Sequence, residues 1–161
     1  LSPEKSPDLA IDVMAHLPDD YSLVIAGDGP MREQLEGSAA QHGGRVTFLG
    51  VRTDIARVLA ATDVVLMPSR TEGVPRAAIE AGLCEVPVVG TDVGGLGWVV
   101  EDGVTGHVLS SFDAAELAAA VIDAVEKRPS FGPAARKRCS EIFGFDAVAD
   151  SWAAALRSVV A

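Results

Sequence analysis

The sequence is poor in aromatic residues and in positive charge. The first shortage limits which residues can fill the core, and the second limits the kinds of partner that the protein can bind. Aromatic residues make up 5% of the 161 positions while hydrophobic residues make up 48%. Ala, Val, Leu and Ile must therefore fill the core, as is usual in layered α/β folds. The chain carries 13 Lys and Arg against 23 Asp and Glu, a net charge of -10. This excludes a general affinity for nucleic acid or anionic membranes, which require a basic face, but not a nucleotide ligand held by local donors.

Cysteine, signal segments and metal-binding motifs are equally scarce. Cys84 and Cys139 form no Cys-x-x-Cys pattern, which favours two buried free thiols over a disulfide or a metal site. His16, His42 and His107 are scattered, and the chain has neither an Asp-x-Asp pair nor a Gly-Lys-Ser/Thr motif, so we expect no bound metal and no NTPase. Without a signal peptide or an apolar run near 20 residues, a cytoplasmic location is expected. Peripheral membrane contact of a longer protein is left open.

Apolar strands alternate with helical segments along the chain, which predicts an α/β fold with a doubly wound parallel sheet. The expected strands cover residues 21–26, 45–49, 63–67, 86–90 and 107–109. Ser6 and Asp54 are expected to cap helices, and Asp113 to open another, because Ser and Asp side chains accept from backbone N–H groups at helix starts. Residues 1–161 form one expected domain, in which residues 129–161 are C-terminal helices.

The most informative stretch runs from Pro68 to Gly106 and holds two strand-to-helix turns. One turn is Glu72-Gly73-Val74-Pro75, and the other leads through Thr91-Asp92-Val93 to Gly94-Gly95. Both turns follow buried strands of a parallel sheet, so they should place helix N-termini and bare N–H groups side by side. Such an arrangement is suited to a phosphate-bearing ligand.

At these residues the sequence resembles a known family. Glu72 and Glu80 are separated by seven residues, and Val-Pro-Val-Val-x-Thr-Asp-Val-Gly-Gly and Glu-Asp-Gly-Val-Thr-Gly follow in order. Gly27-Asp28-Gly29-Pro30 and Val46-Thr47-Phe48-Leu49-Gly50 lie upstream. The set resembles the C-terminal donor-binding domain of retaining glycosyltransferases with two Rossmann-like domains (GT-B), the group 1 family.

The resemblance implies a function and a set of site residues. The protein would transfer a sugar from a UDP-, GDP- or ADP-sugar to an acceptor hydroxyl, with retention of configuration and without a metal or cofactor. Glu72 would contact the donor sugar, and no catalytic residue is assigned. The implied nucleoside-binding residues are Glu80, Leu49, Gly50 and Val51. The implied diphosphate-binding residues are Lys5, Gly73, Val74, Pro75, Gly94 and Gly95.

The sequence departs from the family pattern at a few positions. Ser6 stands where the family has a glycine after the lysine, and Glu85 stands where glycine is commonest. Leu96-Gly97-Trp98 replaces the family's usual Pro-Glu. Two interpretations of Lys5 have equal weight: it binds the diphosphate, or it is a mobile N-terminal lysine without a binding role.

The resemblance also implies a strand before Leu1 and an acceptor-binding domain before that strand. In the usual order of a doubly wound sheet the missing strand is central. We therefore expect a slot between the strands at Tyr21–Ala26 and Asp63–Met67, roughly two strand spacings or 9–10 Å wide. Two other functions remain open at this point, a nucleotide-sugar epimerase and a non-catalytic nucleotide-binding module.

Overall fold

The computed structural model describes residues 1–160, in which all strand pairing is parallel. One sheet has two strands in the order β1-β2, and the other has three in the order β3-β4-β5. The strands are β1 (Leu23–Ala26), β2 (Val46–Gly50), β3 (Val65–Met67), β4 (Val88–Thr91) and β5 (Gly106–Leu109). Each lies within about two residues of the range expected from the sequence, so the predicted α/β class with parallel strands is confirmed.

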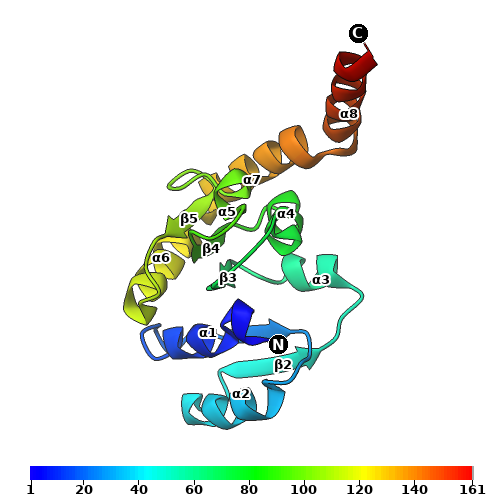
Figure 1. Ribbon diagram of the computed structural model, residues 1–161. Helices are drawn as coiled ribbons and strands as arrows, with labels where there is room; N and C mark the ends of the chain where they lie inside the picture. Colours follow the sequence, from blue (N-terminus) through cyan, green and yellow to red (C-terminus); the bar gives the residue numbers. More distant parts are fainter. Residues whose placement is uncertain (161) are drawn as a thin grey trace.

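Helices connect the strands and cover both sheets (Figure 1). They are α1 (Pro7–Val13), α2 (Arg32–Ala39), α3 (Ile55–Ala60), α4 (Arg76–Leu83), α5 (Leu96–Val99), α6 (Ala114–Glu126), α7 (Arg128–Phe143) and α8 (Phe145–Val160). Short 3-10 helices cover Pro3–Lys5 and Ala40–His42. Helix α7 packs on α4, whereas α8 extends away from the sheets. Within the described residues, no helix combines the length and apolarity that crossing a membrane requires.

The core is divided among separate hydrophobic clusters. Val88 and Leu96 belong to the cluster on the α4 side of the larger sheet, and Val89 and Leu117 to the cluster on the α6 side. The smaller sheet has its own cluster, which includes Ile25 and Leu35. Apolar β-branched residues on both faces of β4 are what a fully covered parallel strand requires.

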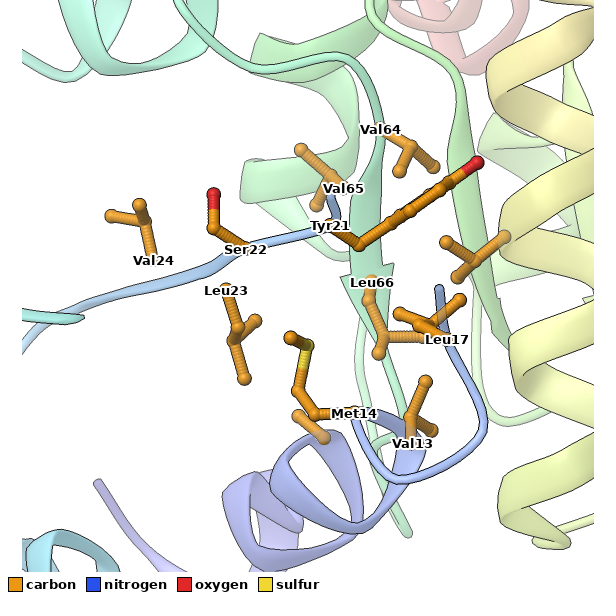
Figure 2. Close-up of a pocket in the computed structure, with 12 residues that line it drawn as sticks. Val13, Met14, Leu17, Tyr21, Ser22, Leu23, Val24, Val64, Val65 and Leu66 are labelled. Atoms are coloured by element: carbon orange, nitrogen blue, oxygen red, sulfur yellow. The ribbon is translucent and has the colours of Figure 1, made fainter. Parts of the chain in front are cut away.

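A slot separates β1 from β3, as the sequence predicted. The two strands belong to different sheets. A cavity of about 170 Å³ lies between them, and residues of α1 line it as well. Figure 2 shows Leu23 and Val24 on one side and Val65 and Leu66 on the other, with Met14, which follows α1, nearby.

Of the helix starts marked in the sequence, only one is capped by the expected side chain. Asp113 accepts from the N–H groups of Ala115 and Glu116 at 2.9 and 3.0 Å. Ser6 precedes α1 but makes no capping bond, and its backbone is left-handed with φ 43°. Asp54 precedes α3 without capping it, because both its carboxylate oxygens accept from the Arg52 guanidinium at 2.9 and 2.7 Å. The stronger charged donor takes the carboxylate from the backbone.

Both cysteines are free thiols, as predicted, but only one of them is buried as expected. Cys139 is buried, and Cys84 is half-buried. Burial raises the pKa of the Cys139 thiol, so this side chain stays protonated and packs as a small apolar group.

Glu85 adopts the left-handed backbone that the family's glycine would adopt without strain. Its φ is 60°, and it directly follows the C-cap of α4. The N–H of Glu85 donates to the Gly82 carbonyl and that of Val86 to the Ala81 carbonyl, each at 3.0 Å. This is the Schellman pattern, in which glycine is the favoured residue.

Relief of this strain gives a stability prediction. Glu85→Gly should be more stable than Glu85→Ala by about 1 kcal/mol, because alanine keeps the left-handed cost and glycine does not. Both variants lose the same exposed ion pair with Arg136, so the comparison isolates the backbone. Urea unfolding of the two variants provides the measurement, and equal midpoints would contradict the assigned strain.

Candidate functional site

The carboxyl ends of the two sheets meet at one edge of the molecule. The Leu1 nitrogen donates to the carbonyl of Asp28, which follows β1. Three residues after Leu1, the Glu4 carbonyl accepts from the N–H of Arg70, which follows β3, at 2.8 Å. The segment from Leu1 to Lys5 therefore crosses from one sheet to the other along this edge. In parallel α/β sheets this is the edge where ligands bind.

Glu72 lies at this edge with both carboxylate oxygens engaged. Lys5 Nζ donates to Oε2 at 2.7 Å, and Ser69 Oγ donates to Oε1 at 2.7 Å. The Glu72 side chain is only 6% exposed while that of Lys5 is 55% exposed. The ion pair places the Lys5 ammonium beside the Glu72 carboxylate. Two residues that the resemblance assigned to sugar and diphosphate are thus brought together.

Ser69 is a site residue that the sequence analysis missed. It is buried, and its carbonyl accepts from the hydroxyl of Thr91, which is also buried at the end of β4. Ser69 thereby joins the ends of β3 and β4 and holds Glu72. The spacing Ser-x-x-Glu was a signal for it, because Ser and Glu side chains three residues apart can bond at the start of a turn.

The two glycine turns pack directly against each other. Gly95 N–H donates to the Gly73 carbonyl at 2.6 Å. A Cβ at Gly94 would overlap the Glu72 carbonyl, and Gly94 has a left-handed φ of 57°. Only glycine permits this approach.

The turns therefore lie side by side as predicted, but not every N–H there is bare. That of Gly95 is already bonded to Gly73. Pro75 has no N–H and cannot donate a hydrogen bond to a diphosphate, so it can contribute to such a site only by shaping the turn. It also lies one position before the first helical residue, as the N-cap of α4.

The nucleoside-binding candidates lie on two elements. Glu80 lies on α4, where Arg76 Nε approaches its Oε1 at 3.1 Å. The four-residue spacing of Arg76 and Glu80 was a readable signal for this pair. Leu49 and Gly50 end β2, and Val51 follows with 75% exposure. A hollow of about 250 Å³ lies beyond it, lined by Arg52 and Asp54 of the loop and by Arg57 and Val58 of α3.

Metal-binding groups do not accompany these residues. Within residues 1–160 there is no cluster of three or more His, Cys, Asp and Glu side chains arranged to hold a metal ion. Lys5 offers this site a positive charge, and the two turns offer uncharged backbone N–H groups.

Comparison with known proteins matches nearly the whole chain. The model of the family "Glycosyl transferases group 1" matches residues 1–142. A D-inositol 3-phosphate glycosyltransferase from Mycobacterium marinum is 39% identical over 132 residues, covering 75% of this chain and 28% of the relative. The enzyme of the same name from Mycobacterium sp. strain KMS is 37% identical over 148 residues, which cover 87% of this chain and 33% of the relative. The chain thus spans about a third of these relatives.

Solved structures agree with this match. Anabaena HepE in complex with UDP superposes with a TM-score of 0.89 at 31% identity, covering 98% of this chain and 46% of that one. Sucrose-phosphate synthase from Thermosynechococcus elongatus superposes with a TM-score of 0.87 at 28% identity. The match covers 99% of this chain and 43% of the synthase. The fold is thereby confirmed as Rossmann-like. Because the family model matches residues 1–142 of this chain, the chain belongs to the group 1 glycosyltransferases.

Proposed function

We propose that this chain is the donor-binding part of a retaining glycosyltransferase. It binds a nucleoside diphosphate sugar, whose sugar is transferred to an acceptor hydroxyl held by another part of a longer protein. The observation that carries the proposal is the pair of glycine turns packed beside the Lys5–Glu72 ion pair. The Mycobacterium relatives are named as glycosyltransferases, which favours sugar transfer over the epimerase alternative.

The charges of the site suit a diphosphate beside a sugar. The chain has a net charge of -10, so an anionic ligand must find its donors locally. Lys5 supplies a compact positive charge, and the N–H groups at the start of α4 and in the Gly94 turn supply dipoles. The Anabaena protein was solved with UDP and with UDP-glucose, which supports a ligand of this class.

Glu72 is suited to the donor sugar. An ionised carboxylate has about four acceptor positions, and Lys5 and Ser69 occupy one on each oxygen. The remaining positions can accept from sugar hydroxyls. Lys5 also offsets the repulsion between this carboxylate and a neighbouring diphosphate.

Catalysis in this proposal is mainly electrostatic. The bond between the anomeric carbon and the diphosphate oxygen breaks, and the electron pair leaves with the nucleoside diphosphate. A bond to the acceptor oxygen forms on the same face of the sugar, and the acceptor's proton passes to the departing phosphate or to solvent. Lys5 and the N–H groups stabilise the charge that develops on the leaving group, so the proposal requires no metal or cofactor.

Nucleotide binding tests the proposal directly. Calorimetric titration of the folded chain with UDP, GDP and ADP should show binding of at least one of them. The parent nucleoside should bind at least tenfold more weakly, because the contacts to the diphosphate are lost. If none of the three nucleotides binds to a chain whose folding is verified by circular dichroism, the proposal is wrong.

Glu80 provides a second prediction. If its carboxylate accepts from both ribose hydroxyls, Glu80→Gln should cost about 1–3 kcal/mol of affinity for the bound nucleotide, because a charged acceptor is lost. The loss should nearly vanish for the 2′,3′-dideoxy nucleotide. Arg76→Gln is the matched control, since it breaks the same ion pair but keeps the carboxylate. Equal losses for both ligands, or an equal loss in the control, would contradict the ribose contact.

The contact between the turns gives a third prediction. Gly94→Ala should destabilise the chain by about 1–3 kcal/mol and weaken nucleotide binding, because the added methyl and the left-handed backbone force the two turns apart. Gly97→Ala is the control, since a Cβ there meets nothing within 4 Å. Urea unfolding and calorimetry of both variants measure the two effects. A neutral Gly94→Ala would mean that the close approach of the turns is unimportant.

A further inference from the structure

The hollow beyond β2 lies next to the proposed ribose contact. Its lining residues are Arg52 and Asp54 of the loop and Arg57 and Val58 of α3. Leu59 of α3 shares a hydrophobic cluster with Ala78 and Ala81 of α4, and Figure 1 shows the two helices side by side. Glu80, which the proposed function places on the ribose, lies on that same α4. A base attached to this ribose can therefore reach the hollow.

Asp54 presents a carboxylate that accepts two parallel hydrogen bonds. Its Oδ1 accepts from Arg52 Nε at 2.9 Å, and its Oδ2 accepts from Arg52 Nη2 at 2.7 Å. Hydrogen bonds from the guanidinium lower the pKa of Asp54, so the carboxylate is ionised and offers acceptors only. A ligand that replaces Arg52 on this carboxylate must present two neighbouring N–H groups in the same arrangement.

Arg52 is held loosely enough for a ligand to replace it. The side chains of Arg52 and Asp54 are 40% and 33% exposed, and water screens an ion pair at the surface, so that it contributes little to stability. Within residues 1–160 the Arg52 guanidinium donates hydrogen bonds to Asp54 alone. Hydrogen bonds from a bound ligand to the same carboxylate are shielded from water and are therefore stronger.

Guanine is the common nucleobase that carries two neighbouring N–H donors on one edge. Its N1–H and N2–H₂ groups lie side by side, as Nε and Nη2 do in arginine. Uracil presents one N–H between two carbonyl oxygens, and adenine and cytosine each present an amino group beside an unprotonated ring nitrogen. The Asp54 carboxylate would face repelling lone pairs on these three bases, whereas guanine can donate to both of its oxygens.

Arg57 adds a donor for the next atom on the same edge of guanine. It lies three positions after Asp54, and side chains at this spacing are neighbours on a helix surface. Because O6 of guanine adjoins N1–H, a guanidinium beside the carboxylate can donate to O6, an acceptor that arginine commonly binds. Val58 lines the hollow as well and offers an apolar surface to the face of the base.

We propose that this hollow selects guanine as the base of the bound nucleotide, which makes a GDP-sugar the preferred donor. Asp54 accepts from N1–H and N2–H₂ after Arg52 moves aside, and Arg57 donates to O6. This inference rests on the proposed function, because it names the base of the same ligand. It concerns the side chains of this chain and not the fold, since the Anabaena structure of the same fold was solved with UDP.

Calorimetric titration of the folded chain with GDP, UDP, ADP and inosine diphosphate tests the selection. GDP should bind more tightly than UDP and ADP by about tenfold or more. Inosine diphosphate keeps N1–H and O6 but lacks the N2 amine, so it should bind about tenfold more weakly than GDP. If UDP or ADP binds as tightly as GDP, the base assignment is wrong and the proposed function stands. Failure of all four nucleotides to bind would overturn both.

Asp54→Asn separates the base contact from the rest of the nucleotide. The amide has the size of the carboxylate but turns an NH₂ group towards one of the guanine donors, so GDP affinity should fall by about tenfold or more. UDP affinity should stay the same, and the difference between GDP and inosine diphosphate should vanish.

Arg52→Gln is the matched control. It breaks the same ion pair but keeps the carboxylate, so GDP affinity should be unchanged or higher. Circular dichroism verifies that both variants fold. An equal loss of GDP affinity in the two variants, or a loss in Asp54→Asn that UDP shares, would contradict the guanine contact.

Discussion

Helix α1 holds the two sheets of this domain together, because its residues pack into two different cores. Leu9 and Val13 belong to the cluster of the larger sheet, whereas Ile11 belongs to the cluster of the smaller one. No hydrogen bond of a shared sheet joins β1 to β3 in the part of the chain described. One helix of seven residues thus packs against both sheets.

The segment before this helix links the slot to the ligand site. Residues from Leu1 to Lys5 close the carboxyl mouth of the slot through contacts with the loops after β1 and β3. The same segment ends in Lys5, which pairs with Glu72. The contact between the two sheets and the position of Lys5 are physically coupled, since both depend on the same five residues.

The site itself follows from parallel strands that end in small residues. Gly94 and Gly95 let the turn after β4 approach the backbone of Glu72 and Gly73, and Ser69 and Thr91 join the strand ends beneath them. The carboxylate of Glu72 is tolerated in this buried position because Lys5 and Ser69 both donate to it. A strongly acidic chain can thus present a local site for an anion.

The sequence by itself determined the elements, the family and the identity of most candidate residues. Strand and helix ranges are local properties, because hydrophobic period and turn chemistry act over a few neighbouring residues. Only the tertiary structure decided which groups meet. Lys5 and Glu72 are 67 positions apart, Gly95 donates its N–H to Gly73 rather than leaving it bare, and Asp54 binds Arg52 instead of capping α3. Such contacts depend on how loops from different strands pack against each other, and on which donor wins a shared acceptor, and neither is encoded in local periodicity.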